Sequence, residues 1–391
     1  MTRLSHLECA RCNEHHDASV LQQRCTCGGP LVPRYDLGPL DLAEVRKRPP
    51  GTWRYRELLP VEGDPVSLGE PETPLLFAPR LSERLGTEIW IKDDGILPGG
   101  TFKARGACVA LSRARELGVE EIVMPTAGNA GGTWSLYAAR AGLRITVVMS
   151  DRAPVANQTE VTLAGGELVL VDGTIADAGD RAKELADERG AFYAATFFEP
   201  YRIDGKKAAW LEVFDGFGDD TSMRFPATMF IPVGGGVAAW AAAKAVSEVT
   251  ALGWATGPGP RLIGVQAANA APIARAFERG DDEVLPWDED PMTIAAGLRV
   301  PRPIEGTEVL SQIRDSGGAV MAVSESDIVR GMRMFAAIEG VYACPEGATT
   351  LAAADALEAT GELHGPVVLY NTGSGAKYVD AISRFLSSGP R

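Results

Sequence analysis

The sequence has few cysteines and few histidines for its length. Its 391 residues include six cysteines and four histidines. Six unevenly spread cysteines cannot cross-link a chain of this size, which excludes a disulfide-stabilised secreted scaffold and favours a reducing, cytoplasmic location. The histidines are His6, His15, His16 and His364, and none lies in a serine–histidine–aspartate context. Because the sequence also lacks a phosphate-binding P-loop and an HExxH motif, the corresponding hydrolase and nucleotide-binding mechanisms are excluded.

Long apolar runs and positive charge are also scarce. No stretch approaches the ~18 uninterrupted apolar residues of a membrane-spanning helix, and the first residues lack the apolar core of a signal peptide. Lys and Arg number 38 against 52 Asp and Glu, which gives a formal net charge of −14 at pH 7. A nucleic acid or an anionic membrane requires a basic protein surface, so we expect neither as a partner. A small anionic substrate is still compatible, since a pocket can be basic within an acidic protein.

The remaining composition is that of a globular protein, with 45% hydrophobic and 23% charged residues, and the length predicts two or three domains. From Glu88 onward, short apolar runs alternate with longer amphipathic ones, which is typical of parallel sheets with crossover helices. The predicted strands are Glu88–Lys92, Glu121–Pro125, Ile145–Ser150, Glu167–Asp172, Thr228–Val233, Arg261–Ala267, Ala319–Val323 and Pro366–Asn371. The predicted helices are Lys103–Leu117, Ala130–Ala141, Ala156–Ala164, Asp177–Arg189, Val237–Thr250 and Glu325–Glu339.

Residues 1–37 differ from the rest, because four of the six cysteines and three of the four histidines lie there. The cysteines form a CxxC pair and a CxC pair. Two such hairpins can present four thiolates tetrahedrally to Zn²⁺, which stabilises a module too small for a core of its own. The predicted ligands are Cys9, Cys12, Cys25 and Cys27. Since the second pair is CxC rather than CxxC, His15 or His16 is an alternative ligand, and unliganded thiols or a redox pair are alternative interpretations.

A lysine among glycines is the first motif with chemistry of its own. The segment Pro98-Gly-Gly-Thr-Phe-Lys103-Ala-Arg-Gly106 places Lys103 in the first turn of a predicted helix. Glycines let a ligand approach the backbone closely, and the positive end of the helix dipole disfavours an ammonium ion, which lowers the pKa of the amine. A partly neutral lysine can form an imine with an aldehyde. A lysine taken alone is more often a solvated residue on an outer helix face.

Four further segments carry candidate binding groups. Pro125-Thr-Ala-Gly-Asn129-Ala-Gly-Gly132 follows a predicted strand and offers backbone N–H groups to a carboxylate. Pro232-Val-Gly234-Gly-Gly236-Val237 exposes consecutive N–H groups to a phosphate, without the GxGxxG spacing of a dinucleotide site. The last two are Cys344-Pro-Glu346-Gly-Ala-Thr349 and Tyr370-Asn-Thr372-Gly-Ser-Gly375. Each is weak alone, and the segments that follow strands are also compatible with ordinary turns.

Together and in this order, the five motifs resemble the fold type II family of pyridoxal-phosphate enzymes, and the threonine synthases most closely, over nearly the whole chain. The resemblance implies an α/β fold of two open twisted domains with the cofactor between them, and a homodimer. We expect a zinc-ribbon-like segment at residues 1–37 and a large, cofactor-phosphate-binding domain at residues 38–87 and 205–391. The small domain at residues 88–204 then carries the Schiff-base lysine and the Thr-Ala-Gly-Asn loop.

The resemblance also implies roles for single residues, beginning with Lys103 as the Schiff-base lysine of pyridoxal 5'-phosphate. The implied cofactor contacts are Lys103, Asn129 at the phenolic oxygen, Gly234, Gly235, Gly236 and Val237 at the phosphate, Glu346 near the ring, and Thr372 at the pyridine nitrogen. The implied substrate contacts are Thr126, Ala127, Gly128 and Ala130 at the carboxylate, with Arg105, Arg202 and Lys206 as candidate anion contacts. A hydroxyl at the pyridine nitrogen tempers the electron sink and favours elimination over transamination.

The implied activity is the conversion of O-phosphohomoserine, a small amino-acid substrate, and water to threonine and phosphate. Two features differ from many threonine synthases: Ala104 stands where an aspartate is common, and the glycine loop lacks an asparagine. Both features resemble threonine/serine ammonia-lyases, so such a lyase or a β-replacing amino-acid synthase is the alternative. A non-catalytic binding protein that kept the fold is a third hypothesis.

Overall fold

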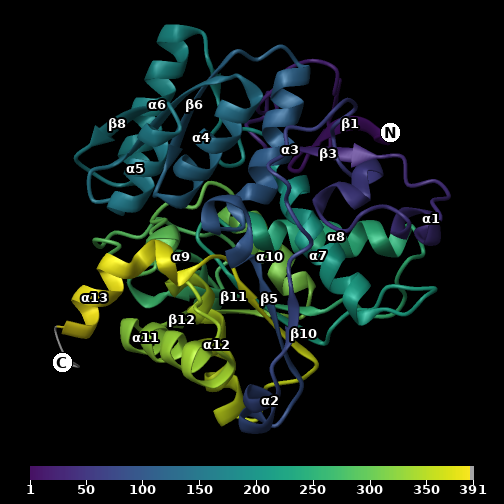
Figure 1. Cartoon of the computed structure of the whole chain (residues 1–391), viewed down its shortest axis with the longest axis vertical. Helices are drawn as coiled ribbons and strands as arrows, with labels where there is room; N and C mark the ends of the chain where they lie inside the picture. The colour runs from purple at the N-terminus through teal and green to yellow at the C-terminus, as the bar shows by residue number, and fades with distance from the viewer. Residues whose placement is uncertain (388–391) are drawn as a thin grey trace. The chain divides into compact units, whose positions relative to one another are not determined.

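The computed structural model describes residues 1–387, which divide into two compact units (Figure 1). Unit 1 comprises Met1–Glu72, Lys103–Glu212 and Ser247–Trp254, and unit 2 comprises Thr73–Phe102, Val213–Val246 and the residues from Ala255 onward. Each unit contains an open sheet with parallel strands, which confirms the predicted α/β class. Among the described residues, no helix has both the length and the apolar character needed to cross a bilayer.

Unit 1 is built on a four-stranded parallel sheet in the order β8-β7-β6-β9. Its strands are β6 (Glu121–Thr126), β7 (Arg144–Ser150), β8 (Glu167–Val171) and β9 (Phe192–Tyr193). Its helices are α1 (Leu42–Arg46), α3 (Lys103–Glu116), α4 (Asn129–Ala141), α5 (Val155–Leu163) and α6 (Ile175–Arg189). Helices α4 and α6 both pack on β6 and β7, and α5 lies beside β8 (Figure 1). In α6, Ala178, Ala182 and Leu185 recur at helical spacing and are buried against Val123 and Val148 of the sheet, which fixes this helix on it.

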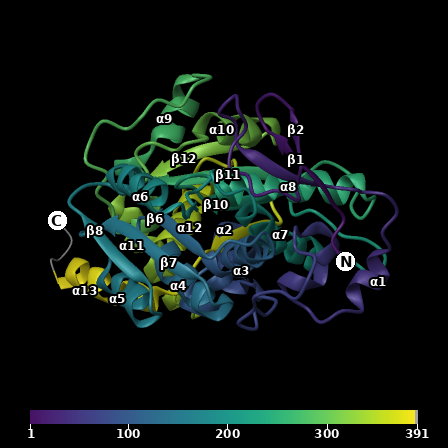
Figure 2. The same ribbon diagram turned by 90° about the horizontal axis from the view of Figure 1, so that it is seen from above.

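The N-terminal segment of unit 1 forms a small antiparallel sheet in the order β2-β1-β3. Its strands are β1 (Leu4–Cys9), β2 (His15–His16) and β3 (Leu31–Tyr35), and β1 and β2 lie side by side in Figure 2. Along β1, Leu7 and Cys9 are buried while His6 and Glu8 are partly exposed. This alternation places the two pairs of side chains on opposite faces of the strand.

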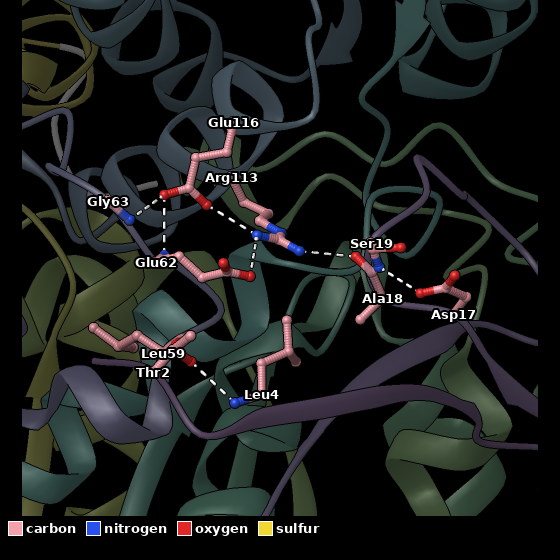
Figure 3. A network of polar contacts seen from close by, with 10 residues as sticks. All are labelled: Thr2, Leu4, Asp17, Ala18, Ser19, Leu59, Glu62, Gly63, Arg113 and Glu116. Atoms are coloured by element: carbon pink, nitrogen blue, oxygen red, sulfur yellow. Dashed lines mark hydrogen bonds and ion pairs between the residues drawn. The ribbon is translucent and has the colours of Figure 1, made fainter.

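Arg113, on α3, joins the N-terminal segment to the helix that begins with Lys103 (Figure 3). Its Nη2 donates to the carbonyl oxygen of Ala18 at 2.8 Å, and its Nη1 pairs with Glu116 at 3.0 Å and with Glu62 at 3.2 Å. The Arg113 side chain is 4% exposed, so its charge depends on these partners rather than on water. The guanidinium therefore holds three segments of unit 1 together.

Unit 2 is built on a six-stranded sheet in the order β12-β11-β10-β13-β5-β4, in which only β4 is antiparallel to its neighbour. Its strands are β4 (Leu75–Phe77), β5 (Ile89–Asp93), β10 (Thr228–Pro232), β11 (Arg261–Ala267), β12 (Ala319–Val323) and β13 (Val367–Asn371). Its helices are α2 (Pro79–Leu85), α9 (Pro272–Arg279), α10 (Gly306–Asp315), α11 (Glu325–Met334), α12 (Pro345–Ala359) and α13 (Val379–Ser387). Helix α12 packs on β10 and β13 and against α11, which leaves it buried on most sides (Figure 2).

Helices α7 (Arg202–Phe217) and α8 (Val237–Ala251) have residues in both units. The predicted helix Glu325–Glu339 is α-helical only to Met334, after which Phe335–Glu339 forms a π-helical turn.

The predicted grouping of residues 88–204 differs from the structure at β5. This strand pairs in parallel with β13, from the far end of the chain, and so belongs to the sheet of unit 2. Residues 38–72, which we expected in the large domain, lie in unit 1. The reason is that pairing between distant segments, and not sequence proximity, decides which sheet a buried strand joins.

Candidate functional site

In unit 1, Lys103 is the first residue of α3. The position of this helix is fixed by close backbone contact with α7. A Cβ on Gly205 of α7 would lie 1.8 Å from the carbonyl oxygen of Arg105, and a Cβ on Gly106 would lie 3.1 Å from the carbonyl oxygen of Arg202. The sequence predicts that Gly106 admits a ligand. The structure corrects this interpretation, because Gly106 admits the backbone of the neighbouring helix.

Arg105 was predicted to contact the substrate, and its surroundings contradict that role. Its side chain is fully buried, and its two Nη atoms donate to the two carboxylate oxygens of Glu212 at 2.8 and 2.7 Å. A buried charge needs such a partner because the protein interior solvates it poorly. Arg105 thus fastens α3 to α7 and does not present its guanidinium to a substrate.

Three cationic side chains, Lys103, Arg202 and Lys206, lie near one another in unit 1. Burial, together with the positive charges of Lys103 and Arg202, lowers the pKa of Lys206 well below its ordinary value. The Arg202 guanidinium donates through Nε to Glu199 at 2.7 Å and lies 4.5 Å over the ring of Trp134. Glu199 therefore compensates the charge of Arg202 more directly than that of Lys206.

The predicted carboxylate loop lies between β6 and α4. The Thr126 hydroxyl oxygen accepts a hydrogen bond from the Gly128 N–H at 3.0 Å, which closes the loop on itself. Gly128 has a φ of 152°, and a Cβ there would lie 2.5 Å from Nδ2 of Asn157. No side chain caps the start of α4 at Asn129, so the first N–H groups of this 13-residue helix suit an anion. The five predicted residues run from the last residue of β6, Thr126, through Ala127 and Gly128 to the first residues of α4, Asn129 and Ala130.

In unit 2, the glycine loop lies between β10 and α8, which begins at Val237. Gly236 has a φ of 87°, and a Cβ there would lie 2.4 Å from the side chain of Val309. A Cβ on Gly234 would lie 2.7 Å from the carbonyl oxygen of Gly297. Only glycine fits at either position, and successive N–H groups at the start of a 15-residue helix suit a phosphate.

Glu346 is a buried acid in unit 2 with one oxygen satisfied and one not. Its Oε1 accepts from the Tyr378 hydroxyl at 2.6 Å and from the Gly297 N–H at 2.7 Å. Its Oε2 is buried without a hydrogen-bond partner among the described residues, which is costly for a carboxylate. The hydroxyl of Thr372 is also buried and lies 3.5 Å from the thiol of Cys344. The side chains of Glu346 and Thr372 are both buried and polar, which suits hydrogen bonds to a polar aromatic ring.

The segment before Lys103 is fixed within unit 2 at the same threonine. The backbone N–H of Phe102 donates to the carbonyl oxygen of Thr372 at 2.9 Å, and the Thr101 hydroxyl donates to the same atom at 3.1 Å. Gly100, with a φ of 65°, accepts from the N–H of Ser374 at 2.9 Å. The contact joins the motif that leads to Lys103 with the motif that contains Thr372. The sequence predicts each motif but not this contact.

The four predicted zinc ligands converge in the N-terminal segment. Their sulfur atoms lie within 4.8 Å of one another, with Cys9 to Cys27 at 3.5 Å and Cys12 to Cys25 at 3.6 Å. Sulfurs around a tetrahedral zinc with ~2.3 Å bonds are separated by roughly 3.8 Å, so the donor set fits this ion. A Cβ on Gly29 would lie 2.6 Å from the Cys9 sulfur, which explains the glycine after the second pair.

Four residues with structural roles near these motifs were not predicted: Glu199, Glu212, Asn157 and Tyr378. Glu212, Tyr378 and Asn157 contact residues that are distant in the sequence, so no local pattern reveals these contacts. Glu199 pairs with Arg202 only three positions away, but an acid before a predicted anion contact does not by itself predict this pair.

Comparisons with known proteins point to one family. The family model of pyridoxal-phosphate dependent enzymes matches residues 66–373. The threonine synthase of Methanocaldococcus jannaschii is 32% identical over 389 residues, covering 96% of this chain and 94% of the relative. That of Methanosarcina acetivorans is 29% identical over 352 residues, covering 89% and 85%.

Solved structures agree as well. A threonine deaminase from T.th. matches with a TM-score of 0.67 at 25% identity, covering 86% of this chain and 98% of that structure. Diaminopropionate ammonia lyase from Escherichia coli matches in fold with a TM-score of 0.68 at 18% identity, covering 83% and 89%. By sequence over most of its length and by fold, the chain belongs to the fold type II family of pyridoxal-phosphate dependent enzymes.

Proposed function

We propose that this chain is a threonine synthase that converts O-phosphohomoserine and water to threonine and inorganic phosphate. The observation that carries the proposal is its similarity to the threonine synthase of Methanocaldococcus jannaschii over 96% of the chain. The sequence motifs at Lys103, Thr126–Ala130, Gly234–Val237 and Thr372 support it.

Lys103 would hold pyridoxal 5'-phosphate covalently. The N–H groups of Gly234, Gly235, Gly236 and Val237 would bind its phosphate, since they lie between the end of β10 and the start of the 15-residue helix α8. Asn129, Glu346 and Thr372 would contact its ring, where the unpartnered Oε2 of Glu346 is available for a hydrogen bond. When bound, the cofactor withdraws electrons from the substrate carbon that it holds.

The loop of Thr126, Ala127, Gly128 and Ala130 would bind the substrate carboxylate, because the uncapped start of α4 favours an anion. The amine of Lys103, on the helix α3 that packs against α4, would remove the protons from the α and β carbons and deliver protons to the γ and α carbons. The γ carbon–oxygen bond breaks as phosphate leaves, and the oxygen of water then bonds to the β carbon. Exclusion of water until that point protects the reactive substrate.

Lys206 is our candidate for the substrate phosphate. An arriving dianion would raise the depressed pKa of Lys206 and favour its protonated form, which strengthens the attraction. Arg202 would contribute its charge only in part, because Glu199 holds its guanidinium. Arg105 has no part in this proposal.

The test is an assay of purified protein with O-phosphohomoserine, in which phosphate and threonine are measured in equal amounts. The Lys103→Ala variant is expected to lose the cofactor absorbance and the activity. Lys206→Met is expected to raise KM for O-phosphohomoserine by at least about tenfold, the loss of one charge-assisted contact. Lys183→Met, an exposed lysine on α6, is the matched control and should not change KM. Absence of turnover with a fully loaded enzyme would refute the proposal.

A threonine/serine ammonia-lyase is the second candidate, and the Glu199–Arg202 pair favours it. A guanidinium already neutralised by a carboxylate attracts a substrate phosphate weakly, whereas threonine or serine carries no such phosphate. Release of ammonia and 2-oxobutyrate from threonine alone, without activity on O-phosphohomoserine, would decide for the lyase.

We further propose that Cys9, Cys12, Cys25 and Cys27 hold a structural zinc ion, as their convergence supports. A homodimer and a cytoplasmic location stay predictions. Light scattering of the purified protein tests the first, and imaging of a tagged chain tests the second.

A further inference from the structure

A second group of metal-binding side chains lies on the N-terminal sheet, separate from the four cysteines. It consists of His6 and Glu8 on β1 and His15 on β2. His6 and Glu8 are two residues apart on one strand, and His15 is directly opposite Glu8 in the antiparallel pair. All three side chains therefore share one face of the sheet. Cys9 follows Glu8 directly, so its side chain points to the opposite face.

The ligand atoms of this group are close enough to meet at one ion. They lie within 4.8 Å of one another, and Oε2 of Glu8 is 3.6 Å from Nε2 of His15 and 3.9 Å from Nε2 of His6. The two imidazole rings stack with their centroids 4.0 Å apart. Ligands around a tetrahedral zinc with ~2.0–2.1 Å bonds are roughly 3.3 Å apart, so the separations from Glu8 need to close by about 0.3–0.6 Å and the remaining one by at most about 1.5 Å.

Neighbouring side chains orient two of these three groups. Nδ1 of His6 is 3.1 Å from the hydroxyl of Ser5, while its Nε2 is buried and has no hydrogen-bond partner among the described residues. Oε1 of Glu8 accepts from Nε and Nη2 of Arg34 at 3.0 and 2.6 Å, which turns Oε2 toward the imidazoles. In metal sites, a ligating histidine or carboxylate is oriented by just such a bond at its other atom.

We propose that His6, Glu8 and His15 form a second metal site, which binds a borderline divalent transition-metal ion such as Zn²⁺. Two imidazoles and one carboxylate are the donors that these ions share, and a water molecule completes the coordination. The ion joins β2, a strand of two residues, to β1 and so stabilises the first hairpin of the ribbon. The site is independent of the proposed enzymatic activity and of the cysteine cluster on the other face.

The test measures Zn²⁺ and Co²⁺ binding to the full-length protein, purified without a histidine tag, stripped of metal and kept reduced. We expect about two Zn²⁺ per chain for the wild type and about one for His15→Ala, in which the most exposed ligand is lost. His364→Ala removes a histidine outside the group and is the matched control, expected to keep the wild-type stoichiometry. Because Co²⁺ bound to thiolates has strong charge-transfer absorption, His15→Ala should keep this absorption while it loses one equivalent of metal.

The cysteine cluster and the histidine site can fail separately in this experiment. Cys27→Ser is expected to remove the thiolate absorption and one equivalent, and to leave the equivalent that His15→Ala removes. If wild type and His15→Ala bind the same amount of metal, whatever that amount is, the second site is refuted. Anomalous diffraction at the zinc edge gives a further readout, with a peak between His6, Glu8 and His15 expected.

Discussion

Neutralising Glu212 should destabilise the helix that carries Lys103 far more than neutralising an exposed acid. Glu212 and Arg105 form a bidentate pair in which both side chains are at most 1% exposed. Removing one partner of a buried pair costs about 3–5 kcal/mol, because the other charge is left without compensation in a poorly solvating interior. Total stabilities are typically ~5–15 kcal/mol, so Glu212→Gln should weaken unit 1 severely.

Native-state hydrogen exchange, measured by mass spectrometry, reports the loss of stability separately for α3 and for α6. A loss of ~3–5 kcal/mol corresponds to exchange roughly 10²–10⁴-fold faster for the amides of α3 that open with the helix. The control is Glu184→Gln, since Glu184 pairs with Arg181 at 2.9 Å while the two side chains are 63% and 40% exposed. That pair is worth less than ~1 kcal/mol, so exchange in α6 should rise by at most about fivefold.

A double variant separates the loss of attraction from the cost of an unpaired charge. Arg105→Met with Glu212→Leu keeps the volume and removes both charges, so it should recover most of the protection that Glu212→Gln loses. If Glu212→Gln exchanges like the wild type, or if the double variant is no better than the single one, the buried pair does not stabilise α3.

Three further results are expected. Gly205→Ala should lower the melting temperature by several degrees, because its Cβ would lie 1.8 Å from the Arg105 carbonyl oxygen. Gly179→Ala on α6 is the control and should be neutral or slightly stabilising, because the nearest atom to its Cβ is 3.8 Å away. Equal changes in melting temperature would contradict the contact between the helices. The pKa of Lys206 in the folded chain lies below its ordinary 10.5, so between the two values the unfolded chain binds a proton that the native chain lacks. The contribution of Lys206 to stability therefore rises with pH up to about 10.5. Lys206→Met should reduce the slope of urea unfolding midpoints against pH in this range, and an unchanged slope would count against the buried lysine. Cys27→Ser should release one zinc ion and increase proteolysis in residues 1–37, and intact zinc content by atomic emission would speak against the thiolate site.

Local patterns predicted most strands because a buried parallel strand is a short apolar run between turns. The segments Arg261–Ala267 and Ala319–Val323 were predicted with the bounds that β11 and β12 have. Helix α12 was not predicted as a helix, since burial on most sides leaves it no polar face to create a 3.6-residue period. The sheet to which β5 belongs could not be predicted from the neighbouring sequence either. Its partner β13 lies near the other end of the chain, and the apolar run at Ile89–Asp93 would suit either sheet.

In the candidate site too, the sequence predicts features that depend on neighbouring residues and misses those that depend on distant ones. A glycine loop at the end of a strand binds anions through its own backbone, so the loop at Gly234–Val237 can be predicted from its sequence. An arginine is different, because the same side chain serves a ligand or a distant carboxylate, and only the fold supplies that carboxylate. Arg105 pairs with Glu212, which is 107 positions away in the sequence, and Arg202 pairs with Glu199, which is three positions away. In both pairs a carboxylate binds the guanidinium. Lys206 remains the one predicted anion contact whose depressed pKa makes it gain from an arriving phosphate, and substrate specificity should respond to it more than to either arginine.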